Sequence, residues 1–456
     1  MENYQSLIDE QKEFFNTNTT KDVAFRLEAL DKLKTGIKQH EDALLAALKE
    51  DLNKSAFDAY STEIGFTLQE ISFIERRLRA WAKPKKVKKP ITHIGTKSLI
   101  YPEPYGVSLI IAPWNYPFQL AVAPLLGAIA AGNCAIIKPS EFTPKTSQVL
   151  QNIIAELFPE KYIAVVQGGV ETSQALLSSN VDYIFFTGSV PVGKIVMKAA
   201  AENLVPVTLE LGGKSPCIVH EDANIKLAAK RIAWGKFTNA GQTCIAPDYL
   251  YVHKNVKEQL LTELRAVIKD FFGNNPLENE NYTHIVNEQH FNRLSAYLTN
   301  GETIIGGNSN KEELSIEPTV LTTITWDDPI MKDEIFGPIL PAMEYGELSE
   351  VITGISQHPN PLALYLFTEN DQVEEKILEN VSFGGGCIND TLYHLSTPYL
   401  PFGGVGTSGH GAYHGKSSFD TFSHQKSVMK QTNLFDMSLR YPNAKNGLKK
   451  IKKYLK

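Results

Sequence analysis

The chain has few cysteines, no excess of positive charge and no long apolar run, and each of these absences excludes a class of protein. Its four cysteines among 456 residues are too scattered for a disulfide framework, and none has the spacing of a metal site. The net charge of −6 gives no reason to expect nucleic acid as a partner, because a phosphate backbone requires a basic face. No uncharged apolar run reaches the roughly 18 residues of a membrane-spanning helix. The polar start MENYQSLIDEQKEFF is unlike a secretion signal, so we expect a cytoplasmic protein.

The length and the order of patterns predict more than one domain. A chain of 456 residues exceeds one ordinary core, and its 43% hydrophobic content supplies enough apolar residues for two or three. Apolar residues recur at three- and four-residue steps up to about Trp81, which predicts helices. KPKKVKKP (83–90) predicts a solvated turn out of this domain, and ITHIGTKSLI behind it predicts a projecting hairpin.

After residue 100, short apolar strands alternate with helical stretches. VSLIIAP, CAIIKP, IAVVQGG and VDYIFFTG are strand-like, and a second alternating block follows Glu210. Nearly continuous apolar strands joined by helices predict an α/β fold with parallel sheets covered on both faces. Ligands of such sheets bind at the carboxyl ends of the strands, so the turns there are the candidate sites.

Two of these turns carry groups that suit a dinucleotide. In FFTGSVPVGK (185–194), Gly188 allows a tight turn, Ser189 offers a hydroxyl, and Gly193 lets the next helix approach with its free N–H groups. In IIKPSEFTP (136–144), Lys138 and Glu141 could hold ribose hydroxyls. A purely structural glycine turn explains the first pattern equally well. For the second, a helix start capped at Ser140 is the better explanation on local sequence alone.

Two further turns carry groups that could take part in catalysis. Asn115 in APWNYPFQL could donate its amide to an oxyanion, or it could cap the helix that follows. Glu210 in LELGGKSP lies among leucines, where a raised pKa would suit a general base. It could equally be a surface carboxylate, although the paired glycines beside it indicate close approach by backbone or ligand.

Cys244, in the polar turn GQTC, differs from the other cysteines. Cys134, Cys217 and Cys387 lie in or beside apolar strand-like runs, where cysteine behaves as a core residue. A nucleophile and an ordinary loop thiol both fit the surroundings of Cys244.

Seven ordered motifs resemble the NAD(P)-dependent aldehyde dehydrogenase superfamily. They are WNYPFQL, KPSE, FTGSVPVG, ELGGKSP, GQTC, EIFGP and PFGGVGTSGHG, and they extend from about residue 100 to about 430. GQTCIAPDY, YPEPYGV and GAYHGKSSFDTFSHQKSV resemble its class 3 branch, which includes the fatty aldehyde dehydrogenases.

The resemblance implies two doubly wound α/β domains and a small bridging β arm. The dinucleotide-binding domain would cover residues 1–209, with the arm at about 83–101. The catalytic domain would cover 210–408, and a bridging segment with a basic tail would cover 409–456.

The resemblance also implies oxidation of an aldehyde to the acid, with a role for each matching residue. Cys244 would attack the aldehyde, and Asn115 with the Cys244 N–H would stabilise the oxyanion. Glu210 would activate the water that hydrolyses the thioester. Glu334 and Phe336 would position the nicotinamide ribose, and Glu334 would also share duty as a base. Lys138 and Glu141 would hold the adenosine ribose. The remaining cofactor-binding matches would be Trp114, Gly188, Ser189, Gly193 and Leu211.

NAD is the expected cofactor, because a carboxylate at Glu141 would repel a 2′-phosphate, with NADP as the alternative that the class 3 branch also accepts. The branch also implies a homodimer, bridged by the hairpin near 91–100 and the strand-like segment 424–430. An acylating, coenzyme A-dependent enzyme is disfavoured by Glu210, and a catalytically silent protein by the intact motifs. The chemistry does not name the aldehyde.

Two features near the carboxyl end, a group of histidines and a basic tail, can each be explained without a functional role. Four histidines (394, 410, 414 and 424) lie there, but the surrounding glycines disfavour a metal-binding helix, so no metal is expected. The tail NAKNGLKKIKKYLK (443–456) has six lysines, with Leu448, Ile451 and Leu455 at helical spacing. It fits a weak, peripheral contact with an anionic membrane, or simply a solvated terminus.

Overall fold

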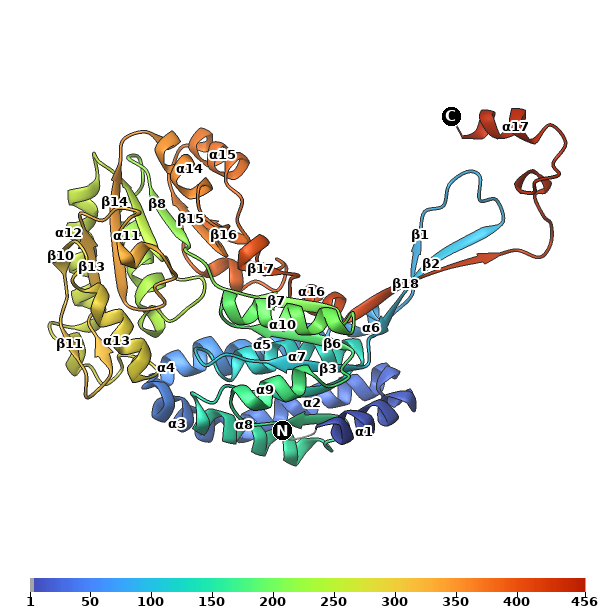
Figure 1. The fold of residues 1–456 in the computed structure, drawn as a ribbon, viewed down its shortest axis with the longest axis horizontal. Coiled ribbons are helices and arrows are strands. Elements are labelled where there is room, and N and C mark those ends of the chain that lie inside the picture. Colours follow the sequence, from blue (N-terminus) through green and yellow to red (C-terminus); the bar gives the residue numbers. More distant parts are fainter. Residues whose placement is uncertain (1–3, 456) are drawn as a thin grey trace.

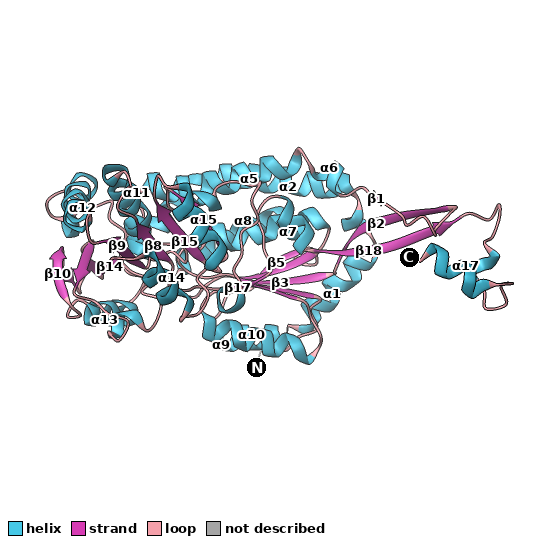
Figure 2. Ribbon diagram, turned by 90° about the horizontal axis from the view of Figure 1, so that it is seen from above, coloured by secondary structure: helices cyan, strands magenta, loops and turns pink. Residues whose placement is uncertain are grey.

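Two twisted β-sheets with their helices occupy neighbouring parts of the molecule, and a long β arm projects from one end (Figure 1). The computed structural model describes residues 4–455. Figure 2 shows the same division from above, with the seven-stranded sheet at one end and the arm at the other.

The chain begins with helices, as predicted. α2 is capped by Asp22, whose carboxylate accepts from the Ala24 N–H, and α4 is capped by Ser55. One π-helical turn, η2, joins α4 to α5. The helices are α1 Gln5–Asn16, α2 Val23–Gln39, α3 Glu41–Leu52, α4 Ala56–Ala59, η2 Tyr60–Ile64, α5 Gly65–Glu75 and α6 Leu78–Trp81.

The first sheet has six strands in the order β17-β7-β6-β3-β4-β5, parallel except for the edge strand β17. Every residue of β3, β4 and β6 is buried, which is why these strands read as continuous apolar runs. The strands are β3 Val107–Ile111, β4 Cys134–Lys138, β5 Ile163–Val165, β6 Tyr183–Thr187, β7 Val207–Glu210 and β17 Gly409–His410.

Helices cover both faces of this sheet, with α9 and α10 on one side and α7 and α8 on the other (Figure 2). α7 is buried along its whole length and belongs to the core. The chain runs from β3 outward through β4 to β5, then returns to add β6 and β7 on the other side of β3. The crevice at such a reversal, outside the strand carboxyl ends, is where α/β sheets bind ligands. The helices are α7 Gln119–Ala131, α8 Pro144–Leu157, α9 Val170–Leu177 and α10 Val190–Glu202.

The second sheet has the order β10-β13-β14-β9-β8-β15-β16, and only the β10–β13 pair in it is antiparallel. It contains β8 Pro216–Val219, β9 Tyr249–His253, β10 Glu302–Ile305, β13 Thr319–Thr322, β14 Ile339–Tyr345, β15 Ala363–Phe367 and β16 Gly385–Ile388. The accompanying helices are α11 Ile225–Phe237, α12 Lys257–Phe272, α13 Glu288–Tyr297, α14 Leu348–Ser356 and α15 Asp371–Asn380. A small separate pair joins β11 Ser309–Asn310 to β12 Ser315–Ile316.

The arm consists of β1 Lys85–Val87, β2 Thr96–Pro104 and β18 Ser423–Gln431. A projecting hairpin is present, but its strands are β1 and β2, so the prediction of a hairpin within 91–100 was wrong in its bounds. The prediction of a turn at 83–90 was also wrong, since Lys85 pairs with Ile100 in an antiparallel strand. Lysines are compatible with an edge strand because their side chains reach solvent. α16 Lys416–Thr421 leads into β18, which pairs with β2 along its whole length.

The tail forms a short helix, α17 Gly447–Tyr454, near the arm (Figure 1). Its lysine at position 456 lies outside the described residues. Within residues 4–455, no helix is both long enough and apolar enough to cross a membrane.

Candidate active site

Cys244 lies on the sharp turn that follows α11. Asn239, Ala240 and Gly241 have φ angles of 56°, 50° and 71°, so three consecutive residues in the left-handed region reverse the chain. A Cβ on Gly241 would lie 2.2 Å from the carbonyl oxygen of Gly337, so this position requires glycine. Cys244 is partly exposed on this turn.

The other cysteines occupy strands. Cys134 in β4 and Cys217 in β8 are buried, as predicted for core residues. Cys387 in β16 is only partly buried, and its Sγ lies 3.5 Å from Nδ1 of His394, so for this residue the prediction holds in part.

Two carboxylates lie within electrostatic reach of the Cys244 thiol. Burial raises the pKa of Cys244, and the negative charges of Glu334 and Glu210 raise it further. The thiol is therefore protonated at rest, and a nearby base has to accept its proton before it can act as a nucleophile.

Asn115 connects the end of β3 with the cysteine turn. Its side-chain Nδ2 donates to the main-chain carbonyl of Gln242 at 3.0 Å. The main-chain carbonyl of Asn115 accepts from Nδ2 of Asn239 at 2.9 Å. The alternative of a helix cap is wrong, because α7 begins at Gln119 with Phe118 at the cap position. An amide nitrogen carries two hydrogens, so Nδ2 keeps a second donor beyond the one given to Gln242.

Glu210 is the last residue of β7 and is 3% exposed. Within the described residues neither of its carboxylate oxygens has a hydrogen-bond partner. Burial raises the pKa of Glu210 well above its usual range, which confirms the expected direction and excludes the alternative of a surface carboxylate. A buried carboxyl group without a protein partner is free to bind a water molecule.

Glu334 fills the space beside the Gly212–Gly213 pair. A Cβ on Gly212 would lie 2.0 Å from Oε2 of Glu334, and the Gly213 N–H donates to this carboxylate. The inference that the two glycines mark a close approach is therefore confirmed. Burial, reinforced by the charge of Asp248, raises the pKa of Glu334 to about 8.

The glycine-rich segment 400–411 packs against β7. Gly409 pairs with Glu210, and a Cβ on Gly409 would lie 2.6 Å from the carbonyl oxygen of Leu209. A Cβ on Gly404 would lie 2.2 Å from the carbonyl oxygen of Ser408. Close backbone approach therefore accounts for these glycines.

Lys138 and Glu141 form an ion pair at the end of β4. The Nζ of Lys138 lies 2.7 Å from Oε2 of Glu141. The lysine side chain is buried, and the glutamate side chain is the more exposed of the two. Ser140 does not cap a helix here, because α8 begins at Pro144 with Thr143 at the cap position. The alternative of a capped helix start is therefore wrong, and the pair remains available for hydroxyl groups.

Ser189 occupies the cap position of α10, and in the described part of the chain its side chain makes no capping hydrogen bond. A Cβ on Gly193 would lie 2.6 Å from a methyl carbon of Leu211, so this glycine brings α10 close to the chain after β7. The Gly188 N–H donates to the Glu210 carbonyl at 3.0 Å and extends the sheet into the turn. An exposed hydroxyl at a free helix start suits a phosphate group.

These groups share one edge of the sheet. The register pairs Ile111 with Lys138, and Thr187 with Glu210, so the carboxyl ends of β3, β4, β6 and β7 are adjacent. The edge thus combines an ion pair for hydroxyl groups with a helix start for phosphate, and it fits a dinucleotide.

Trp114 and Phe336 form an aromatic contact beside this edge. Their ring centroids are 5.2 Å apart, and the ring of His290 also lies 5.2 Å from that of Trp114. Phe336 has a φ angle of 50°, a conformation that a bulky residue rarely adopts. Burial lowers the pKa of His290 to about 4, so this ring is neutral.

Three residues without a predicted role contact the Asn115 segment: Lys54, Glu63 and Asn239. Asn239 lies two residues before the GQTC motif, so its proximity to Cys244 in sequence is a signal that could have identified it. Lys54 and Glu63 lie in a helical region whose pattern gives no signal of a site.

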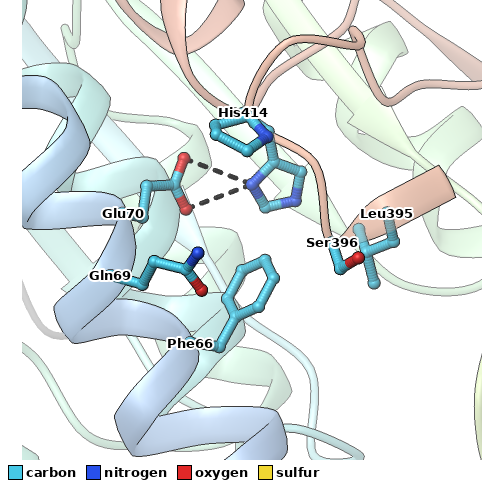
Figure 3. Close-up of a pocket in the computed structure, with 7 residues that line it drawn as sticks. Phe66, Gln69, Glu70, Leu395, Ser396 and His414 are labelled. Carbon is cyan, nitrogen blue, oxygen red and sulfur yellow. Dashed lines mark hydrogen bonds and ion pairs between the residues drawn. The ribbon is translucent and has the colours of Figure 1, made fainter. Parts of the chain in front are cut away.

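His414 faces Glu70 beside a small pocket (Figure 3). Its Nδ1 lies 3.1 Å from Oε2 of Glu70, and the Gly415 N–H donates to the same carboxylate at 3.1 Å. Both side chains are buried, so the pair ties the carboxyl-terminal segment to α5. Among residues 4–455, no cluster of three histidine, cysteine or acidic side chains suits a metal ion.

The family model and the similar proteins all indicate the same family. The model of the aldehyde dehydrogenase family matches residues 1–428. The chain is 52% identical over 449 residues to the 4,4′-diaponeurosporen-aldehyde dehydrogenase of Staphylococcus aureus, covering 98% of each chain. It is 43% identical over 444 residues to rat aldehyde dehydrogenase family 3 member B1, covering 97% of this chain and 95% of the relative. It is 40% identical to the dimeric NADP-preferring aldehyde dehydrogenase of the dog, covering 97% and 98%.

A solved structure described as the substrate-bound state of Staphylococcus aureus AldH superposes with a TM-score of 0.98. It is 51% identical in sequence and covers 100% of both chains. The predicted two-sheet α/β fold with its arm is confirmed by this agreement.

Proposed function

The chain belongs to the aldehyde dehydrogenase family, in its class 3 branch, and oxidises an aldehyde with NAD or NADP; we propose that Cys244 is the nucleophile and Glu210 the hydrolytic base. The observation that supports this most directly is the proximity of the Cys244 thiol to two buried carboxyl groups with raised pKa values.

The first step forms a bond from Sγ of Cys244 to the aldehyde carbon. The thiol proton passes to a neighbouring carboxylate, and the carbonyl electrons move to oxygen. Asn115 Nδ2 and the Cys244 N–H stabilise this oxyanion, as one such donor typically contributes about 2.7–4 kcal/mol. A bound NAD or NADP supplies the hydride acceptor, and loss of hydride from the tetrahedral carbon leaves a thioester on Cys244.

The second step is hydrolysis. Glu210 accepts a proton from water, the oxygen attacks the thioester carbon, and the Cys244 thiolate leaves as the carboxylic acid forms. Glu334 holds the nicotinamide ribose and shares duty as a base. Burial raises the pKa of both carboxyl groups, that of Glu334 to about 8, which makes each a stronger base than an exposed carboxylate once it has lost its proton.

We assign cofactor binding to residues 1–209 and catalysis to 210–408. Lys138 and Glu141 hold the adenosine ribose, and Ser189 with the start of α10 holds the pyrophosphate. The remaining contacts are assigned to Trp114, Gly188, Gly193, Leu211 and Phe336. NAD is preferred, because the Glu141 carboxylate repels a 2′-phosphate.

We also propose that a long apolar aldehyde is the substrate class. The Staphylococcus aureus relative is named for such an aldehyde. The exposed rings of Trp234 and Tyr393, 5.9 Å apart, lie on α11 and just after β16, where they offer apolar surface near the cysteine turn.

We further propose a cytoplasmic homodimer, bridged by the hairpin near 91–100 and the segment 424–430 of β18, with weak peripheral membrane contact through the tail. The unpaired outer edge of β18 and the name of the dimeric relative support the dimer. Lysines and exposed apolar residues on α17 support the membrane contact.

The test is reduction of NAD or NADP by a panel of short, aromatic and long-chain aldehydes, with and without coenzyme A. The proposal expects a carboxylic acid without coenzyme A and the highest kcat/KM for long chains. Strict dependence on coenzyme A would indicate the acylating enzyme. No reduction with any aldehyde would indicate a silent protein.

A further inference from the structure

We propose that the buried Lys54–Glu63 ion pair is a positioning device that holds the Asn115 segment against the cysteine turn. The inference rests on the proposed function, in which Asn115 stabilises the oxyanion. Neither Lys54 nor Glu63 is assigned a contact with substrate or cofactor.

Both charged side chains of the pair are buried, which is unusual for lysine and glutamate. The side chains of Lys54 and Glu63 are 1% and 0% exposed, and Nζ of the lysine donates to Oε1 of the glutamate. Glu63 lies on the π-helical turn η2, a rare local geometry that often accompanies functional sites. Two charges removed from water cost free energy unless further partners offset the loss of hydration.

Asp58 adds a nearby negative charge to Lys54, and the further hydrogen-bond partners of the two side chains belong to one segment, residues 115–119. Nζ of Lys54 donates to the Asn115 carbonyl at 3.0 Å and lies 4.1 Å from the ring centre of Tyr116. Oε2 of Glu63 accepts from the N–H groups of Phe118 and Gln119 at 2.9 and 3.2 Å. Lys54 therefore holds the main-chain carbonyl of Asn115, and Glu63 holds the N–H groups of Phe118 and Gln119 at the start of α7.

The cysteine turn holds the same segment through further hydrogen bonds. Nδ2 of Asn239 donates to the carbonyls of Asn115 and Gln242, and the Tyr116 hydroxyl lies 2.7 Å from that of Thr243. The Asn115 carbonyl thus accepts from both Lys54 and Asn239. Without Lys54 the Asn115 carbonyl keeps only the hydrogen bond from Asn239, so the side-chain amide of Asn115 can shift relative to Cys244.

A positional effect of this kind should appear in kcat. A misplacement of about 1 Å at a reacting group can cost on the order of 100-fold in rate. The substitution Lys54→Met removes the donor and the charge while it keeps the length of the side chain. Lys54→Met/Glu63→Gln removes both charges, and the amide oxygen introduced by the second substitution can still accept from the start of α7. This double variant is used if the single one fails to fold.

The experiment is a double-mutant cycle with Asn115→Ala, read as kcat, aldehyde KM and thermal midpoint, with rates normalised to the concentration of folded protein. We expect kcat to fall at least about tenfold for Lys54→Met and about 100- to 1,000-fold for Asn115→Ala. In the Asn115→Ala background, Lys54→Met should cost less than twofold further, because the amide it positions is absent.

Lys34→Met is the matched control, because Lys34 pairs with Glu75 at 2.8 Å in the same helical layer. Its kcat should equal that of the wild type. Wild-type kcat for folded Lys54→Met, or effects that multiply in the combined variant, would overturn the positioning role and leave the proposed function intact. Wild-type kcat for Asn115→Ala would overturn the oxyanion assignment and this inference together.

Discussion

Nδ2 of Asn115 lies 3.0 Å from the carbonyl oxygen of Gln242, two residues before Cys244. This hydrogen bond joins the end of a strand in the first sheet to a turn of the second. A nucleophile and an oxyanion donor that come from different sheets depend on the packing between those sheets, so their relative position is a property of the whole fold.

Replacement of Cys244 by alanine should abolish oxidation, with turnover lower by at least ~10⁴, because nothing else in the site can form the thioester. Binding of NAD, followed by fluorescence titration, should stay near the wild-type value since Cys244 is not assigned to the cofactor. Cys387→Ala is the matched control and should keep its activity. Substantial turnover by Cys244→Ala would place the nucleophile elsewhere.

Glu210→Gln should form the acyl-enzyme but hydrolyse it slowly. Stopped-flow absorbance should show a rapid burst of reduced cofactor and then a steady rate lower by about 100- to 10,000-fold, the usual contribution of a general base. In the wild type the steady rate should rise with pH, because the buried carboxyl group must lose its proton and its pKa is raised. That rise should be absent in the variant. A missing burst would give Glu210 an earlier role.

Much of this site could be predicted because its residues follow buried strands. The continuous apolar runs of β3, β4 and β6 identify those strands, and the polar residues after each run mark the ligand edge. The partners of these residues could not be predicted in the same way. Lys54 meets the Asn115 carbonyl across 61 positions of sequence, and nothing in its local pattern records that contact.

Local sequence also left the two alternatives for Asn115 undecided. Asparagine is a good helix cap, and only the folded chain shows that α7 begins four residues later, where Glu63 accepts its first N–H groups. In the arm, the lysines and prolines of 83–90 predict a turn, yet the segment contains the short strand β1. Its conformation depends on pairing with β2 more than on its own composition, so local sequence could not predict it.

Cofactor choice should depend on Glu141. The wild-type enzyme should have a higher kcat/KM with NAD than with NADP, because the proposed assignment of Glu141 to the adenosine ribose would bring its carboxylate near a 2′-phosphate of like charge. Glu141→Gln should improve the NADP-to-NAD ratio by about tenfold, equivalent to ~1.4 kcal/mol. Initial rates with both cofactors at several concentrations measure the ratio. A wild-type preference of tenfold or more for NADP would contradict the assignment.

The arm should hold two chains together. Light scattering at micromolar concentration should give a mass of twice 50.7 kDa. Met429 is 53% exposed on β18, the outer strand of the arm, so Met429→Glu should place a charge in the interface and shift the equilibrium toward monomer.

Leu434→Glu, just beyond the strand, is the control and should remain dimeric. A monomeric wild type would remove the arm from consideration as a bridge.

The tail should bind anionic membranes weakly and release them in salt. On α17 and at its end, the side chains of Leu448, Ile451 and Leu455 are 71%, 37% and 73% exposed, and lysines occupy positions between them. Each lysine near anionic headgroups contributes about 1 kcal/mol, and that attraction weakens with ionic strength. Three apolar anchors add too little buried area for stable insertion, so the contact should be reversible.

Co-sedimentation with phosphatidylserine-containing vesicles measures this contact, with the full chain compared with one that ends at Tyr441. The full chain should pellet at low salt, stay in solution with neutral vesicles, and be released at about 0.5 M salt, where the screening length falls below the roughly 8 Å of physiological solutions. A variant with serine at 448, 451 and 455 keeps every lysine and separates the apolar contribution from the charge. Since the rest of the chain is acidic overall, the truncated protein has no comparable attraction, and equal pelleting of both proteins would show that the tail is only a solvated terminus.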